Sequence, residues 1–143
     1  MGAAPDTVII GAGQAGLATS YWLTHFGVEH QLLERRESLG GAFQDRWDSF
    51  YMNTPNLALD LPGMPYDGDD RQAFIPRTAA MNLFRRYAEL IAAPVHTGVD
   101  VTKASIASGG DFELETTLGS LRARKVVFAT GAYQVPKIPA IAA

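Results

Sequence analysis

Cysteine is absent from the 143-residue sequence. Its absence excludes disulfide bonds, thiolate metal ligands and dithiol redox chemistry within this chain. The three histidines lie far apart along the sequence, and the acidic run at 67–70 lacks the later glutamate of a calcium-binding loop. We therefore expect no metal site.

Long hydrophobic runs and an excess of one charge are also missing. The first residues lack the basic segment and the apolar stretch of a signal peptide, and the longest apolar runs have only the length of strands. This pattern predicts a cytoplasmic protein with no membrane partner. Lys and Arg total 12 against 15 Asp and Glu, a net charge of -3. Because no basic stripe is present, no nucleic-acid partner is expected.

The residues that are present favour one packed α/β domain over residues 1–143. Hydrophobic residues make up 47% and charged residues 19% of the chain. The β-branched run at 7–10 is typical of a buried parallel strand, and glycines follow it directly. A helical pattern covers 14–26 and a second strand pattern covers 29–34. This order predicts a right-handed βαβ unit.

The middle of the chain has a different composition. Prolines, glycines and aromatic residues interrupt residues 38–75, which predicts irregular backbone with a functional role. A helix is expected over 78–92, with Thr78 as its cap and with Met81, Phe84 and Ile91 on the buried face.

The last third reads as strands. Alternating patterns at 99–106, 111–117 and 120–124, separated by glycine turns, predict an antiparallel β-meander. The apolar run at 125–129 ends in a glycine-containing turn and is expected to rejoin the parallel sheet.

A glycine motif follows the first strand. Gly11, Gly13 and Gly16 match the G-x-G-x-x-G pattern, in which the first glycine makes a tight turn, the second admits a pyrophosphate and the third allows close helix packing. Gln14 and Ala15 open the predicted helix, so their amides are expected to face the phosphates. The alternative is an ordinary strand-turn-helix.

The second strand ends in an acid at the expected distance. Glu34 lies 18 residues after Gly16, near the ~20 typical of a carboxylate that binds ribose hydroxyls. Such an acid repels a 2′-phosphate, which argues against NADP at this position. It does not separate FAD from NAD, and a lone acid at a strand end could simply be solvated.

A second glycine pair separates these two cofactors by resemblance. The string at 34–41, ERRESLGG, resembles the E-R/K-x-x-x-x-G-G extension of two-dinucleotide-binding flavoproteins. NAD dehydrogenases usually lack this extension. Glu34, Arg35 and Gly41 are thereby implied as FAD-binding residues, although an ordinary glycine turn remains the alternative.

The resemblance extends along the chain to flavin-containing monooxygenases of the group B type. The segment at 40–50, GGAFQDRWDSF, is similar to their G-G-x-W/F…R-W-D-S segment, and Ala129, Thr130 and Gly131 resemble the A-T-G motif that ends a strand beside FAD. The family's second G-x-G-x-x-G, for NADPH, is not found. The resemblance therefore implies a truncated two-dinucleotide-binding protein with a Rossmann-like FAD-binding fold and no NADPH domain.

The same resemblance implies roles for further residues. Asn53 is expected near the reactive part of the flavin as the catalytic residue, or it shapes the turn before a proline. Arg46 and Trp47 are expected to contact flavin or pyrophosphate, or to pack in the core. Phe43 and Val101 complete the implied FAD-binding set.

Two classes of function follow, an enzyme and a binding module, with three hypotheses between them. The full-length protein is expected to use FAD and NADPH, to form a flavin peroxide and to oxygenate a small organic substrate, with the 143 residues alone inactive. The alternatives are a non-catalytic FAD-binding fragment and, third, the nucleotide-binding half of an NAD-dependent dehydrogenase.

Overall fold

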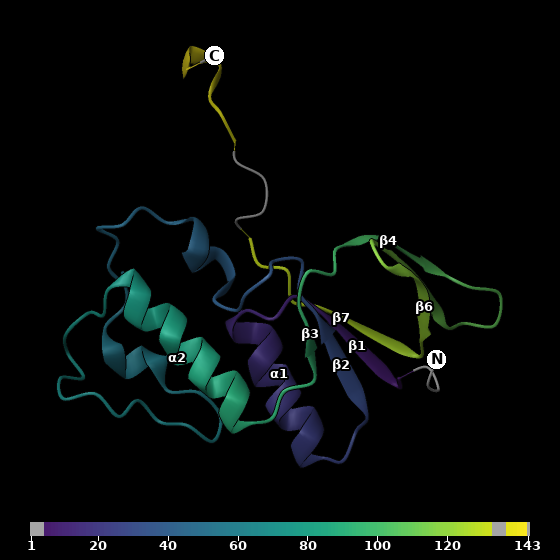
Figure 1. The fold of residues 1–143 in the computed structure, drawn as a ribbon, viewed down its shortest axis with the longest axis horizontal. Coiled ribbons are helices and arrows are strands. Elements are labelled where there is room, and N and C mark those ends of the chain that lie inside the picture. The colour runs from purple at the N-terminus through teal and green to yellow at the C-terminus, as the bar shows by residue number, and fades with distance from the viewer. Residues whose placement is uncertain (1–4, 133–136, 143) are drawn as a thin grey trace.

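A computed structural model of the chain describes residues 5–132 and 137–142. Its centre is a four-stranded parallel sheet in the order β3-β2-β1-β7 (Figure 1). The strands are β1 (Thr7–Ile10), β2 (His30–Leu33), β3 (Val95–His96) and β7 (Lys125–Phe128). The predicted return of the chain to the parallel sheet at 125–129 is confirmed, and the two-residue strand β3 was not predicted.

The predicted βαβ unit is present. Strand β1 leads through the helix α1 (Gln14–His25) to β2, and Ile9 of β1 lies beside Leu32 of β2 and beside Val127 of β7. All four residues of β1 are buried, which explains why its sequence is continuously β-branched and apolar rather than alternating.

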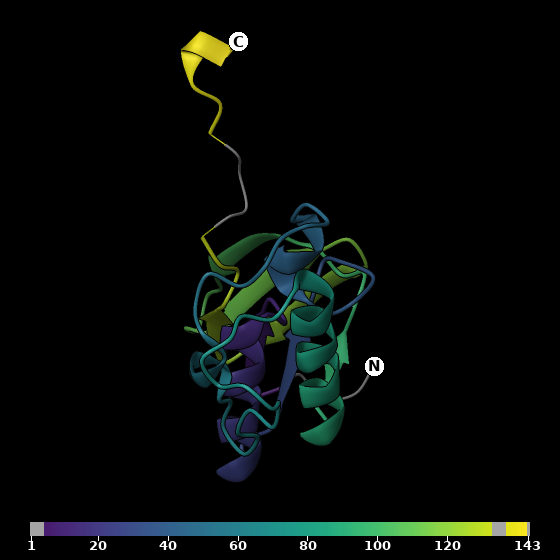
Figure 2. The same ribbon diagram turned by 90° about the vertical axis from the view of Figure 1, so that its left-hand side faces the viewer.

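A second helix lies beside α1 on the same face of the sheet. Figure 2 shows α2 (Arg77–Leu90) next to α1, and buried residues of both helices form one core cluster with Ile9 and Leu32. Within α2, Phe84 is buried as predicted. The buried face of the helix carries Ala80, Leu83, Phe84, Tyr87 and Ala88.

Three details of the α2 prediction are wrong. Met81 is only half-buried because it lies at the edge of that face, and Ile91 is only half-buried at the C-cap, beyond the last residue of the helix. Thr78 does not cap the helix. The cap is Pro76, whose carbonyl accepts the first helical hydrogen bond from Ala80 at 3.1 Å; proline fixes φ near the value required to enter a helix.

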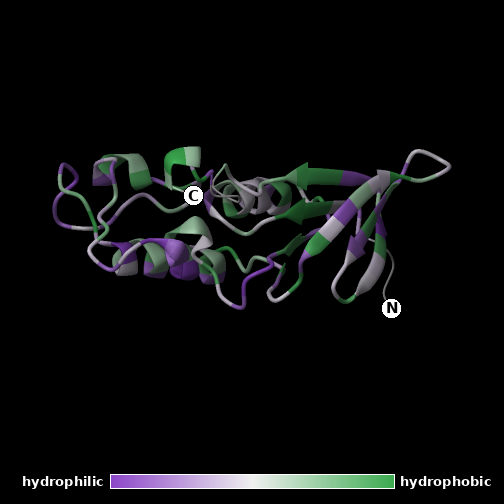
Figure 3. Cartoon of the chain, turned by 90° about the horizontal axis from the view of Figure 1, so that it is seen from above, coloured by the Kyte–Doolittle hydropathy of each residue, from purple (hydrophilic) through white to green (hydrophobic). Residues whose placement is uncertain are grey.

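The predicted meander covers the other face of the parallel sheet. Its strands are β4 (Val101–Ile106), β5 (Phe112–Thr116) and β6 (Gly119–Ala123), paired in that order and antiparallel. Val8, Ile10 and Leu33 form a second core cluster with Leu114 and Ala123. Figures 1 and 3 show the helices and the meander on opposite sides of the parallel sheet.

The segment predicted to be irregular contains two short 3-10 helices, η1 (Gly41–Asp45) and η2 (Asn56–Leu59), joined by turns and isolated bridges. A further 3-10 turn, η3 (Ala140–Ala142), follows near the C-terminus. The observed fold is thus α/β, with a parallel sheet between a helical layer and an antiparallel meander. Segment η1 lies at the carboxyl end of the parallel strands, where it borders the candidate site.

Candidate nucleotide-binding cleft

A cavity of about 710 Å³ opens at the carboxyl ends of the parallel strands. The last residues of β1, β2 and β7, which are Ile10, Leu33 and Phe128, all line it. Ligands of open α/β sheets bind at this edge, because loops from adjacent strands diverge there. The fold therefore places the predicted glycine motif, acid and terminal turn around one space.

Two glycines of the motif are required by packing. Gly11 has φ +101°, and an added Cβ would lie 2.5 Å from the carbonyl oxygen of Ala129. An added Cβ on Gly16 would overlap the carbonyl oxygen of Gly11. Only glycine lets the turn, the helix and the end of β7 approach this closely.

Gly13 differs from these two because nothing lies within 4 Å of the position its Cβ would take. Its φ of -79° is open to any residue, and it forms the N-cap of α1 without a side-chain capping bond. Gly13, Gln14 and Ala15 all line the cavity. The first amides of α1 and its partial positive charge therefore face a space in which an anionic group fits.

Glu34 is buried at the end of β2, with 4% of its surface exposed. Its Oε2 accepts a 2.9 Å hydrogen bond from the Ala12 amide, and its Oε1 accepts a 3.0 Å bond from the Arg36 amide. Glu34 also lines the cavity. Each carboxylate oxygen has a second lone pair that can accept a hydrogen bond from a ligand hydroxyl. The expected contact with a ribose stays a prediction.

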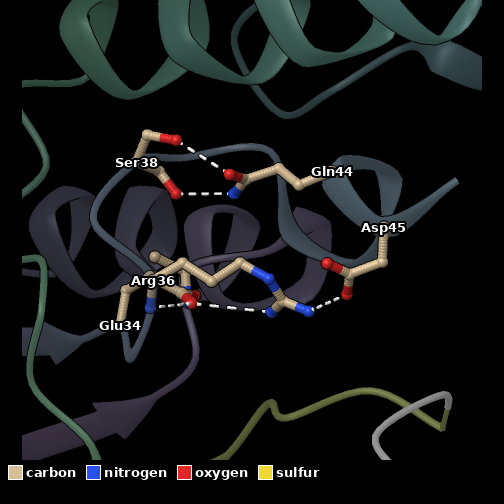
Figure 4. Close-up of polar contacts among 6 residues, drawn as sticks. Glu34, Arg36, Ser38, Gln44 and Asp45 are labelled. Carbon is tan, nitrogen blue, oxygen red and sulfur yellow. Dashed lines mark hydrogen bonds and ion pairs between the residues drawn. The ribbon is translucent and has the colours of Figure 1, made fainter. Parts of the chain in front are cut away.

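Basic side chains lie beside this acid. The Arg36 guanidinium is 3.8 Å from Glu34 Oε1 and donates to the Asp45 carboxylate at the end of η1 (Figure 4). Arg35 and Arg36 both line the cavity. The charge of Glu34 is thus balanced by a neighbouring cation, and the same cation links β2 to η1.

The wall opposite the glycine turn is formed by the start of η1. Gly40, Gly41, Ala42 and Phe43 line the cavity, and an added Cβ on Gly41 would lie 3.4 Å from the Cα of Gly13. The second glycine pair of the sequence therefore meets the first glycine motif in space.

Most residues predicted from the sequence come together here. The predicted residues that line the cavity are Gly11, Gly13, Gln14, Ala15, Glu34, Arg35, Gly41, Phe43, Val101, Ala129, Thr130 and Gly131. Gly16 does not line it and instead packs α1 against the glycine turn.

Three further predicted residues lie outside the cavity lining. Asn53 is exposed. Trp47 is 62% exposed, with its ring edge-on to Phe50 at 5.2 Å, so its interpretation as a core residue is wrong. The Arg46 guanidinium lies 5.5 Å from the centre of the Phe50 ring. Phe43, four residues earlier, does pack against the core, where it stacks on Phe84 at 5.6 Å.

The structure adds lining residues that the sequence reasoning missed. These are Ile10, Leu33, Arg36, Gly40, Ala42, Val99, Asp100, Phe128 and Ala132. Ile10, Leu33 and Phe128 lie at or next to the ends of predicted parallel strands, and this position was the signal that could have found them. Val99 and Asp100 carried no such signal, because they approach the cavity from the start of the meander.

Among residues 5–132 and 137–142, no group of three His, Cys, Asp or Glu side chains could hold a metal ion. No helix in that part of the chain is long and apolar enough to cross a membrane.

The sequence profile of the pyridine nucleotide-disulphide oxidoreductase family matches residues 8–143. The chain belongs to this family. The family's name refers to disulphide chemistry, but this chain has no cysteine and therefore cannot form a disulfide.

This oxidoreductase family member is similar to proteins named as oxidoreductases and flavin monooxygenases. It is 31% identical over 96% of its length to the uncharacterized oxidoreductase CzcO-like of Geobacillus kaustophilus, and 31% identical over 94% to the indole-3-pyruvate monooxygenase YUCCA1 of Oryza sativa. A solved flavin-containing monooxygenase from Stenotrophomonas maltophilia matches 94% of the chain with a TM-score of 0.86 and 29% identity. The recognition of a flavin-containing monooxygenase-like family is confirmed.

The chain spans only part of these proteins. It covers 39% of the Geobacillus protein, 34% of the rice protein and 41% of the Stenotrophomonas protein.

Proposed function

We propose that this chain is the FAD-binding part of a flavin-dependent, NADPH-using monooxygenase that acts on a small organic substrate in the cytoplasm. The observation that carries the proposal is the open space at Gly13, which faces the N-terminus of α1 and is bordered by Glu34 and by the wall at Gly40 to Phe43. A dinucleotide has the groups that these residues suit.

The residues present fit FAD on chemical grounds. The uncapped amides of α1 suit a pyrophosphate, and the buried carboxylate of Glu34 suits ribose hydroxyls while it disfavours a 2′-phosphate. Phe43, Val101 and Phe128 supply apolar lining. When bound, FAD accepts a hydride and passes its electrons to oxygen.

The residues of this chain bind and orient the cofactor in this proposal. Gly13 leaves room for phosphate, Glu34 holds ribose hydroxyls, and Thr130 and Gly131 line the cavity beside the glycine turn. Asn53 is the catalytic residue that the monooxygenase resemblance implies, and it lies on an exposed turn after η1. The half-buried Arg46 and the exposed Trp47 precede it in the chain.

A second candidate function is a module that holds FAD without turnover. The observation that favours it is the position of Asn53 outside the cavity lining, which separates the implied catalytic residue from the implied cofactor site. The third candidate, half of an NAD-dependent dehydrogenase, leaves unexplained why Gly41 of the second glycine pair lies against the backbone of Gly13.

Flavin fluorescence tests the proposal. Adding the 143-residue chain to FAD should quench and polarise the flavin emission saturably, and NADPH should compete only weakly. Displacement of FAD by equimolar NADPH, or no change in emission at any protein concentration, would contradict FAD binding.

A further inference from the structure

Gln44 is fixed on both sides of its amide group by one residue. Ser38 Oγ donates a 2.8 Å hydrogen bond to Gln44 Oε1, and Gln44 Nε2 donates a 2.7 Å bond to the Ser38 carbonyl (Figure 4). The carbonyl of Ser38 can only accept, so the amide has one satisfied orientation. This pair connects η1 to the turn that follows β2.

The main chain of Gln44 is held from a third element. Arg77, the first residue of α2, donates to the Gln44 carbonyl at 3.2 Å and to the Arg46 carbonyl at 2.8 Å. The same guanidinium pairs with Asp48 at 2.9 Å. Gln44 therefore joins the turn after β2, η1 and the start of α2.

The two backbone hydrogen bonds at the ends of η1 are longer than the hydrogen bonds of the Gln44 side chain. The Phe43 amide reaches the Gly40 carbonyl at 3.2 Å, and the Arg46 amide reaches the Phe43 carbonyl at 3.3 Å. A single 3-10 turn has poor hydrogen-bond geometry and little stability of its own. The side chain of Gln44, with bonds of 2.7 and 2.8 Å, supplies the shorter restraints.

The segment restrained in this way is the cavity wall. Gly40 and Phe43 line the cavity, whereas Gln44 and Ser38 do not. An added Cβ on Gly40 would lie 3.4 Å from Cγ of Gln44, so the stem of the glutamine lies directly over the wall. A displaced wall would change the space at Gly13, because Gly41 of the wall lies against the backbone of Gly13.

We infer that Gln44 is a positioning residue that, with Ser38 and Arg77, sets the Gly40–Phe43 wall of the nucleotide cavity. The expected effect of Gln44 on FAD binding rests on the proposed function. The expected ordering of η1 by Gln44 does not require a ligand.

The test uses Gln44→Met, which keeps the length of the side chain and removes both amide bonds. Gln72→Met is the matched control, because Gln72 is exposed and, among the described residues, its side chain makes no hydrogen bond. Ser38→Ala and the double variant S38A/Q44M show whether the two residues act as a unit. Circular dichroism gives the folded fraction by which each affinity is corrected.

Q44M should weaken FAD binding about tenfold, the effect of losing roughly one net hydrogen bond of 1.4 kcal/mol. The double variant should bind FAD no more weakly than Q44M. In the ligand-free chain, amide exchange should accelerate at Phe43 and Arg46 in Q44M but not at Leu32 in the core strand.

Each outcome decides the inference. If the wild-type chain binds FAD and Q44M binds it as tightly as Q72M, the positioning role is wrong. If the wild-type chain does not bind FAD, the proposed function fails, and exchange at Phe43 then decides the role of Gln44: acceleration in Q44M supports it and unchanged exchange overturns it. Equal acceleration at Leu32 would show a general loss of stability and would also overturn it.

Discussion

Glu34 and Ala12 are joined by a 2.9 Å hydrogen bond from the Ala12 amide to the Glu34 carboxylate. Ala12 lies in the middle of the glycine turn, and Glu34, 22 positions later, directly follows the neighbouring strand β2. The acid that the sequence assigns to a ribose therefore also holds the turn that is to receive the phosphates. This relationship gives Glu34 a measurable structural role in addition to its predicted contact with a ligand.

Glu34→Gln should destabilise the ligand-free chain by about 1–3 kcal/mol. Glutamine has only one accepting oxygen, so it leaves the buried amide of either Ala12 or Arg36 facing an NH₂ group. Urea denaturation followed by circular dichroism measures the loss. The control is Glu89→Gln on the exposed side of α2, which should change the unfolding free energy little. Equal stability of E34Q and E89Q would contradict this role.

Gly13→Val and Gly16→Ala should separate binding from folding. Valine at 13 has open space and an allowed backbone, so its cost should be about 1 kcal/mol, that of an unfavourable N-cap. Alanine at 16 would overlap the Gly11 carbonyl and should cost more than about 2 kcal/mol. Thermal unfolding without ligand compares them. A Gly13→Val chain less stable than the Gly16→Ala chain would show that the turn has been misinterpreted.

Tyr87 should make stability depend on pH in the alkaline range. Burial, with a smaller contribution from the nearby Tyr21, raises the pKa of Tyr87 to about 12. Its hydroxyl donates a 2.8 Å bond to the Pro62 carbonyl. Since the folded state holds this proton more tightly than the unfolded state, stability is complete below about pH 10 and falls as the pH rises toward 12.

Tyr87→Phe supplies the comparison. It should cost about 1 kcal/mol at neutral pH, because one hydrogen bond is lost. Its unfolding free energy should then decline less steeply than that of the wild type between pH 10 and 12. Parallel declines for the two proteins in denaturant titrations would exclude Tyr87 as the source of the pH dependence.

The 143 residues alone should not couple NADPH oxidation to oxygenation. Hydride transfer requires the nicotinamide to be placed against the flavin, and placement contributes up to about 7–11 kcal/mol of the barrier. The sequence contains one G-x-G-x-x-G turn, and that turn is assigned to FAD. With FAD present, NADPH consumption should match that of free flavin, with hydrogen peroxide as the product. Saturable sulfide or amine oxygenation would show a second nucleotide site.

The parallel half of the fold was predictable because its signals are local. The run at β1, the glycine turn and the return at β7 each have a sequence pattern that burial on both faces imposes. The cap of α2 was not predictable, because Thr78 and Pro76 both suit the start of a helix and only the packed structure selects between them.

The candidate site was predictable where residues follow parallel strands. Glu34 and Thr130 could be placed at one edge of the sheet from the sequence alone, whereas Asp100 could not, because it reaches the cavity through tertiary packing of the meander. Trp47 shows the opposite error: an aromatic side chain favours burial, yet Trp47 is 62% exposed whereas Phe43 packs against Phe84. Which of two nearby aromatic residues is buried depends on tertiary packing, which a single sequence does not show.

Calorimetric titration of the 143-residue chain with FAD, with NADPH and with FAD after Gly13→Val tests the central claim most directly. The account predicts saturable binding of FAD at one site, much weaker binding of NADPH, and loss of FAD binding in a Gly13→Val chain that remains folded. NADPH binding as tight as FAD, or FAD binding unchanged by valine at 13, would contradict the assignment of this cavity to FAD.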